Sequence, residues 1–93
     1  MVLQVKVRVK LSTLQQFSSA LQKGALDNTK VIGETWCLKQ DPAVGYSIWE
    51  TSDRQDFDNR FNPWRQYYEQ VEVREITTPR EAMVALFGKL QSQ

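Results

Sequence analysis

Apolar and polar residues alternate without a break along the first segment of the chain. Every odd position from 3 to 11 holds valine or leucine, and the even positions between them hold one glutamine and three cations. A repeat of two places successive side chains on opposite faces of a β-strand. The pattern therefore predicts a strand over residues 2–11 with one apolar face and one basic face.

Further along, the chain changes between this repeat of two and apolar spacings of three and four, which place side chains on one side of a helix. Strands are predicted over residues 2–11, 31–39, 45–51 and 71–77. Helices are predicted over residues 13–23, 53–61, 63–69 and 79–91.

Residues that favour helix starts support the first and last of these helices. Ser12 with Gln15 has the spacing of a capping box, and so does Thr78 with Glu81. Pro79 follows Thr78 at the first helical position, where a missing backbone N–H costs nothing. We therefore expect a side-chain cap at both sites.

The middle helix is interrupted by Pro63, which lies inside an otherwise regular apolar stripe. Proline in a helix interior removes a hydrogen bond and clashes with the preceding turn. We therefore expect a break, after which Asn62 caps a second short helix that carries Trp64.

The predicted elements follow the order strand, helix, strand, strand, helix, strand, with one further helix. This is the order of a split βαβ unit, so we expect an α+β, ferredoxin-like βαββαβ fold with an extra C-terminal helix. In that fold a four-stranded antiparallel sheet carries both helices on one face and leaves the other face open. The chain is short enough for one hydrophobic core, so a single domain over residues 1–93 is expected.

The basic residues Lys6, Arg8 and Lys10 are expected to form a row on the open face. Alternate residues of a strand lie about 7 Å apart, which is close enough for three cations to form an anion site. The alternative is that they pair across strands with Glu72 and Glu50. Matching carboxylates favour the second interpretation.

Charge and signature residues give little support to nucleic-acid binding. Lysine and arginine number 12 against 11 acidic residues, so the formal net charge is only +1. The segment from Gly45 to Trp49 partly resembles the signature of the RNA-recognition motif. However, Val44, Ile48 and Gln4 stand where that motif needs a cation and two stacking rings. RNA binding is therefore kept only as a distant alternative.

Several kinds of chemistry lack the residues they need. The chain has no histidine, so it offers neither a histidine-dependent nucleophile nor a cluster typical of zinc or iron. No cofactor or metal site is expected. Cys37 is the only cysteine and lies in an apolar run, which predicts a buried, inert, reduced thiol and a cytoplasmic protein. No apolar stretch approaches the roughly 18 residues of a membrane span.

Four short stretches resemble the dimeric α/β-barrel superfamily, which includes cofactor-free antibiotic-biosynthesis monooxygenases, and most of all a small bacterial subfamily without assigned activity. They are Gly33-Glu34-Thr35-Trp36, Gly45 to Asp53, Pro63-Trp64, and Thr78-Pro79 followed by Glu81-Ala82-Met83. The resemblance implies a homodimer whose two sheets pack through their open faces. It also implies a cavity between sheet and helices in each subunit, and in the monooxygenases such a pocket works without metal or flavin.

The only group of residues that resembles a ligand site is Trp36, Asn62 and Trp64, because the broken helix could bring an amide and two large rings together. The alternative is a capping asparagine with two core tryptophans. The sequence thus favours a small homodimeric protein that binds or transforms a partly apolar molecule without cofactor. A non-catalytic protein-interaction or structural module is the competing class, and whether the protein is an enzyme stays open.

Overall fold

The computed structural model describes residues 1–91 and has the element order expected from the sequence. Its strands are β1 (Val2–Val9), β2 (Val31–Cys37), β3 (Val44–Glu50) and β4 (Tyr68–Ile76). Its helices are α1 (Leu14–Gln22), α2 (Arg54–Phe61) and α3 (Pro79–Gln91), with 3-10 turns η1 (Leu11–Thr13) and η2 (Asn62–Tyr67). The strands form one antiparallel sheet in the order β2-β3-β1-β4, which confirms the α+β ferredoxin-like fold.

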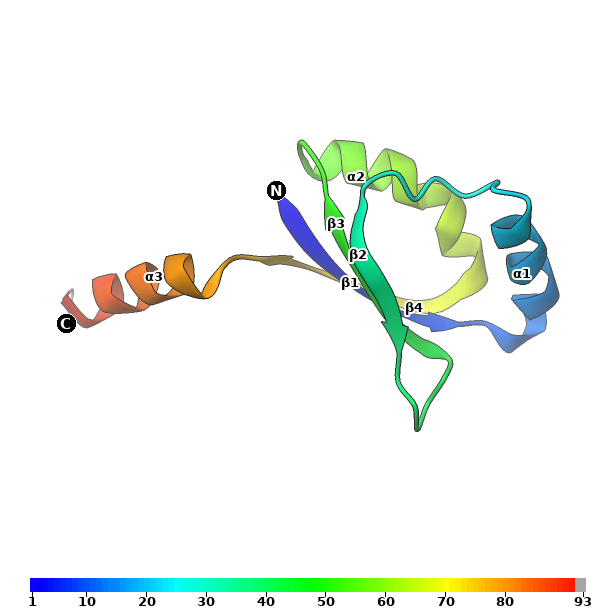
Figure 1. Ribbon diagram of the computed structural model, residues 1–93, viewed down its shortest axis with the longest axis horizontal. Helices are drawn as coiled ribbons and strands as arrows, with labels where there is room; N and C mark the ends of the chain where they lie inside the picture. Colours follow the sequence, from blue (N-terminus) through cyan, green and yellow to red (C-terminus); the bar gives the residue numbers. More distant parts are fainter. Residues whose placement is uncertain (92–93) are drawn as a thin grey trace.

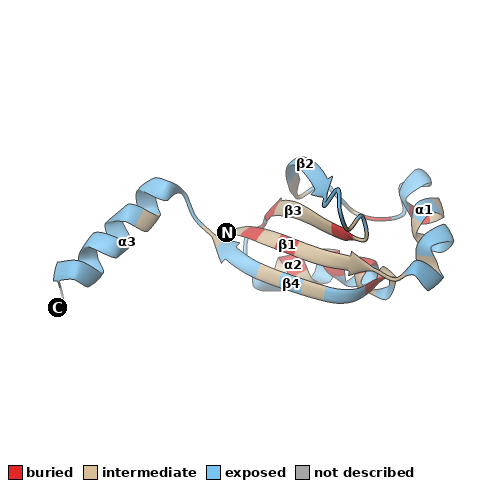
Figure 2. Cartoon of the chain, turned by 90° about the horizontal axis from the view of Figure 1, so that it is seen from below, coloured by how far each residue is buried: buried red, intermediate tan, exposed pale blue. Residues whose placement is uncertain are grey.

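The helix α2 covers one face of the sheet, and α1 lies on the same side at the end where β1 leaves the sheet (Figure 1). On this face Leu3 lies opposite Trp49 and Val5 lies opposite Val73. The side chains of Leu3, Val5 and Trp49 are almost completely buried against Phe57 and Phe61 of α2. The core therefore lies between the central strands and α2, which Figure 2 shows behind the sheet.

The first strand and first helix meet differently from the prediction. β1 ends at Val9, and the N–H of Lys10 donates to the carbonyl of Tyr67 at 2.8 Å instead of continuing a strand. The helix then opens with the 3-10 turn η1, in which the Thr13 hydroxyl donates to the carbonyl of Lys10. The predicted capping box of Ser12 and Gln15 is wrong, because Thr13 occupies the cap position of α1 and makes no side-chain cap.

The break at Pro63 changes the helix into the tighter turn η2 and not into a second α-helix. Asp53 caps α2 by accepting a hydrogen bond from the N–H of Asp56 at 2.8 Å. Asn62 continues the helical backbone at the end of α2, so its predicted role as the cap of a new helix is wrong. The chain leaves η2 directly into β4 at Tyr68, where helix had been predicted to continue.

The edge strand β2 contains an irregularity. Ile32 pairs with Ile48 and Trp36 pairs with Tyr46, so four steps along β2 match two steps along β3. Gly33 lies in this segment with φ +72°, a left-handed conformation that glycine adopts without steric penalty. β2 then ends at Cys37, two residues before its predicted end.

The last helix, α3, projects away from the rest of the molecule (Figure 1). Its start is capped as predicted, since the Thr78 hydroxyl accepts from the N–H of Glu81 at 3.2 Å. The Glu81 carboxylate accepts from the Thr77 hydroxyl, so it does not complete the box on Thr78. No residue of the described helix is buried, and most of α3 is coloured as exposed in Figure 2. Its large apolar side chains are more than half exposed, namely Met83, Val84, Leu86, Phe87 and Leu90.

Candidate functional site

A cavity of about 470 Å³ lies on the helix-covered side of the sheet. It is bounded by the four strands, by α1, and by the segment where α2 passes into η2. Its lining residues are Val7, Val9, Phe17, Leu21, Asn28, Val31, Gly33, Thr35, Trp36, Cys37, Ala43, Gly45, Tyr46, Ser47, Trp49, Phe61, Trp64 and Tyr68. None of these described lining residues carries a formal charge at neutral pH. This size and composition are typical of a small-molecule pocket.

Aromatic rings form much of the cavity wall and fix one another. The Trp49 ring lies edge-on to Trp64, with centroids 6.0 Å apart, and edge-on to Phe61 at 5.7 Å. Phe17 from α1 contacts Tyr68 edge-on at 5.6 Å and Trp64 at 6.2 Å. Edge-to-face pairs at these distances are favourable, so the wall is stiff and flat-sided.

Both indole N–H groups of the wall are already bonded within the protein. The Nε1 of Trp49 donates to the Ser47 hydroxyl oxygen at 2.9 Å, and the Nε1 of Trp64 donates to the carbonyl of Asp27 at 3.1 Å. Ser47 still has its own O–H to offer. Burial raises the pKa of the Tyr68 phenol, with a smaller contribution from the nearby Cys37, so this hydroxyl stays protonated at neutral pH.

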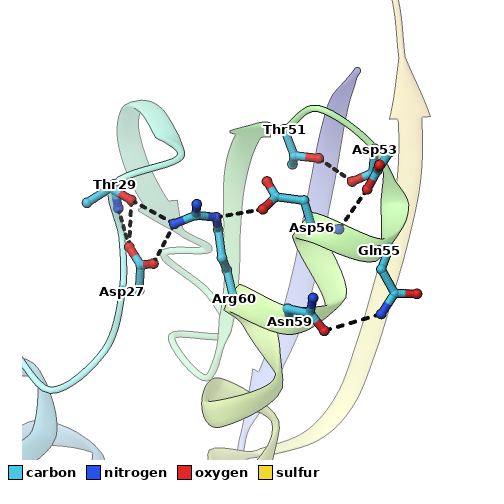
Figure 3. A network of polar contacts seen from close by, with 8 residues as sticks. All are labelled: Asp27, Thr29, Thr51, Asp53, Gln55, Asp56, Asn59 and Arg60. Atoms are coloured by element: carbon cyan, nitrogen blue, oxygen red, sulfur yellow. Dashed lines mark hydrogen bonds and ion pairs between the residues drawn. The ribbon is translucent and has the colours of Figure 1, made fainter.

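A polar network holds the loop before β2 against α2, beside the cavity (Figure 3). The Asp27 carboxylate accepts from the N–H and hydroxyl of Thr29, and from Arg60 at 2.9 Å. Arg60 also donates to Asp56 at 3.0 Å. Hydrogen bonds from Thr29, with a smaller contribution from Arg60, lower the pKa of Asp27. The same loop supplies Asn28 to the cavity lining, so the network fixes one wall.

The three residues of the predicted pocket take different positions. Trp64 is buried and lines the cavity. Trp36 lies at its border, but its pairing with Tyr46 places its side chain on the open face, and it is 67% exposed. Asn62 is exposed and lies outside the lining set. The structure therefore combines Trp64 with Phe17, Tyr68 and other rings, and not with Asn62.

The three residues of the predicted basic row also take different positions. Arg8 forms a two-pronged ion pair with Asp41, at 2.7 and 3.3 Å, which raises the pKa of Arg8 and lowers that of Asp41. Lys10 lies beyond the end of β1. Lys6 faces Tyr46 and Glu72 across the two neighbouring strands. An anion at this row would have to compete with Asp41 for Arg8.

Sequence reasoning missed Tyr68, because it was placed in a helix, and Cys37, because its apolar surroundings predicted burial. The second prediction is wrong, since Cys37 is exposed and lines the cavity. No local pattern in the sequence could have placed either residue, because cross-strand pairing sets their positions: Val9 faces Tyr68 and Cys37 faces Gly45 on the covered side of the sheet.

Two kinds of feature are absent from residues 1–91. No group of three acidic or cysteine side chains in this part of the chain is arranged to hold a metal ion. No helix in it combines the length and apolar character needed to span a membrane.

Comparison with solved structures places this architecture among known proteins. A protein of Bacteroides thetaiotaomicron described as an antibiotic biosynthesis monooxygenase aligns with a TM-score of 0.57 at 12% identity, over 85% of this chain and 89% of the other. The fold is shared. The 5-chloro-2-hydroxyhydroquinone dehydrochlorinase of Burkholderia phenoliruptrix, solved with 2,5-dihydroxybenzoquinone, aligns with a TM-score of 0.56 at 11% identity, over 87% and 98% of the two chains. No protein-family model matches the sequence, and no curated protein matches it.

Proposed function

We propose that this protein binds a small, planar, partly apolar molecule in the cavity between its sheet and its helices. The observation that carries the proposal is an uncharged cavity of about 470 Å³ with a wall of aromatic rings. A fused aromatic or phenolic compound fits such a wall, because its faces can stack while a few polar groups fix its orientation. A charged ligand would lose its hydration there without gaining a partner of opposite charge.

The two structural neighbours support this class of ligand. One is described as an antibiotic biosynthesis monooxygenase, and the other was solved with a dihydroxybenzoquinone. At 11–12% identity they share the fold alone, so the ligand class rests on the cavity and on this analogy together. The proposal is first that the protein binds such a molecule. It also includes a reaction of the bound molecule that needs no cofactor.

We also propose a homodimer formed through the open face of the sheet. This face carries Ile32, Trp36, Tyr46 and Ile48, and Ile32 and Trp36 are well exposed. Two such faces would pack about 10 Å apart and cover these side chains. The exposed apolar side of α3 would then lie against the second copy. A cytoplasmic location stays a prediction.

Titration of the protein with 2-naphthol, followed by tryptophan fluorescence, tests the ligand site. We expect saturable quenching at micromolar concentrations, because two of the three tryptophans belong to the aromatic wall. Gly45→Val should weaken binding at least tenfold, since it adds bulk inside the cavity at a position with ordinary backbone geometry. Gly88→Val makes the same change on α3, outside the cavity lining; it is the matched control and should bind normally. Absence of binding at millimolar 2-naphthol would contradict the proposal.

A non-catalytic interaction module is the second candidate. It is favoured by α3, whose large apolar side chains are all exposed in the described chain. The same titration separates the candidates, because an interaction module needs no ligand in the cavity. RNA binding stays a distant alternative. The open face carries the rings of Tyr46 and Trp36, but Gln4 and Ile48 stand where the RNA-recognition motif needs its other stacking rings.

A further inference from the structure

Cys37 lies where a bound molecule would meet its thiol. It is the only cysteine of the chain, it is exposed, and it lines the cavity. It faces Gly45 on β3, and a Cβ at Gly45 would lie 3.6 Å from the Cys37 sulfur. Because glycine has no side chain, the space beside the sulfur is left open on the cavity side.

Tyr68 gives an independent sign of a ligand at the same place. Tyr68 is only 9% exposed and lines the cavity. Its hydroxyl nevertheless makes no hydrogen bond to any of the described residues. Within residues 1–91, every fully enclosed side-chain oxygen has a hydrogen-bond partner. The Tyr68 hydroxyl has none, so it must still be in contact with open space. A buried phenol that lines a cavity and has no protein partner is suited to donate to an oxygen of a bound molecule.

We propose that Cys37 is a covalent capture site for planar α,β-unsaturated carbonyl compounds, such as quinones and cyclic enones, held in the cavity. The proposal rests on the proposed function, since the ligand must first bind against the aromatic wall. The flat rings select a planar molecule, Tyr68 donates to its carbonyl oxygen, and the soft sulfur nucleophile meets its electron-poor carbon.

The reaction is a conjugate addition. The Cys37 sulfur forms a new C–S bond to the β-carbon, and the C=C π electrons move to the carbonyl oxygen. The proton lost by the thiol returns to the adduct, so S–H has been added across C=C and no external oxidant or reductant is needed. The Tyr68 hydroxyl stabilises the negative charge that develops on the carbonyl oxygen. Its raised pKa keeps it a donor throughout.

The test compares two thiol reagents by intact mass spectrometry. N-Phenylmaleimide is a planar unsaturated carbonyl compound, and iodoacetamide is small and reacts by displacement of iodide. The single cysteine makes the extent of reaction unambiguous. We expect the ratio of the two rates, maleimide over iodoacetamide, to be at least tenfold higher in the native protein than in the protein unfolded in urea.

Three variants sharpen the result. Tyr68→Phe should slow the maleimide reaction about fivefold, the worth of one hydrogen bond, and leave the iodoacetamide rate unchanged. Tyr67→Phe is the matched control, because Tyr67 is half-buried nearby but does not line the cavity. Cys37→Ser should form no adduct with either reagent, because Cys37 is the only cysteine of the chain.

Saturating 2-naphthol should also protect Cys37 from N-phenylmaleimide. Equal rate ratios in native and unfolded protein would overturn the proposal. If 2-naphthol binds but gives no protection, the covalent site is wrong while the proposed function stands. If 2-naphthol does not bind and the rate ratios are equal, both fail.

Discussion

Replacing Trp64 tests whether its ring belongs to the buried wall of the cavity or to the protein surface. Its side chain is 9% exposed, it contacts Trp49 and Phe17 edge-on, and its indole N–H bonds the carbonyl of Asp27. Trp64→Phe keeps one aromatic ring in place and removes the second ring together with the N–H. The substitution therefore deletes two identifiable interactions.

The expected cost follows from those two losses. Leaving the Asp27 carbonyl without its donor costs about 1 kcal/mol. Removing the smaller half of a buried indole costs about 1–2 kcal/mol, since complete truncation of a buried tryptophan to alanine costs about 3–5 kcal/mol. The free energy of unfolding should therefore fall by about 2–3 kcal/mol. That is less than the about 5–15 kcal/mol by which most domains are stable, so the variant should still fold.

Urea unfolding followed by far-UV circular dichroism measures the change in the free energy of unfolding. The far-UV signal is suitable because it does not depend on the tryptophan that is replaced. The protein concentration must be held constant, since dimerisation adds to apparent stability. Leu11→Ala is the control, and it should change the free energy of unfolding by less than about 0.5 kcal/mol because that side chain is 76% exposed. Equal losses in the two variants would refute the assignment of Trp64 to the buried wall.

Three further predictions concern the assembly and the loop network. Truncation after Thr78 should leave the circular dichroism of residues 1–78 unchanged, because no residue of α3 is buried in a single chain. It should raise the dimer dissociation constant at least tenfold in sedimentation. An unchanged dissociation constant would show that α3 is a loose tail. Ile48→Glu, which adds a charge to the open face, should give a folded monomer in the same experiment, and a persistent dimer would exclude packing through that face. The pKa of Asp27 is lowered in the folded state, so its contribution to stability is present above about pH 4, its unfolded value, and is lost as pH falls through the folded value. The urea midpoint of the native protein should therefore fall more between pH 5 and pH 2 than that of Asp27→Asn, and parallel curves would contradict the role of this carboxylate.

The parts of the fold that the sequence predicted well are those with uniform patterns. β1 has an unbroken repeat of two, and its register puts Leu3 and Val5 in the core as expected. The break at Pro63 was predicted because proline has a strong local effect, and the start of α3 because Thr78 can cap only a following helix. In each case a short stretch of chain determines the outcome.

The candidate site was less predictable because it depends on cross-strand neighbours. Tyr68 follows a helical spacing from Trp64, and only pairing with β1 decides that it belongs to a strand. The two extra residues in β2 leave Trp36 on the same face as Ile32 but change its cross-strand partner. Regular pairing from Ile32 would place Trp36 opposite Val44, whereas it lies opposite Tyr46. Cys37 has apolar neighbours in sequence, but the missing side chain of Gly45 leaves its sulfur exposed.

The irregular segment of β2 also bears on how copies of this protein meet. β2 is an outer strand of the sheet, and a regular outer strand offers a row of free N–H and C=O groups to any other strand. Where Gly33 turns the backbone, that row is interrupted, so an incoming strand could not bond along its full length. The other outer strand, β4, is the longest in the sheet but carries alternating charges such as Glu72 and Arg74. Lateral growth into long fibrillar sheets is therefore disfavoured at both edges, although the chain exposes considerable apolar surface.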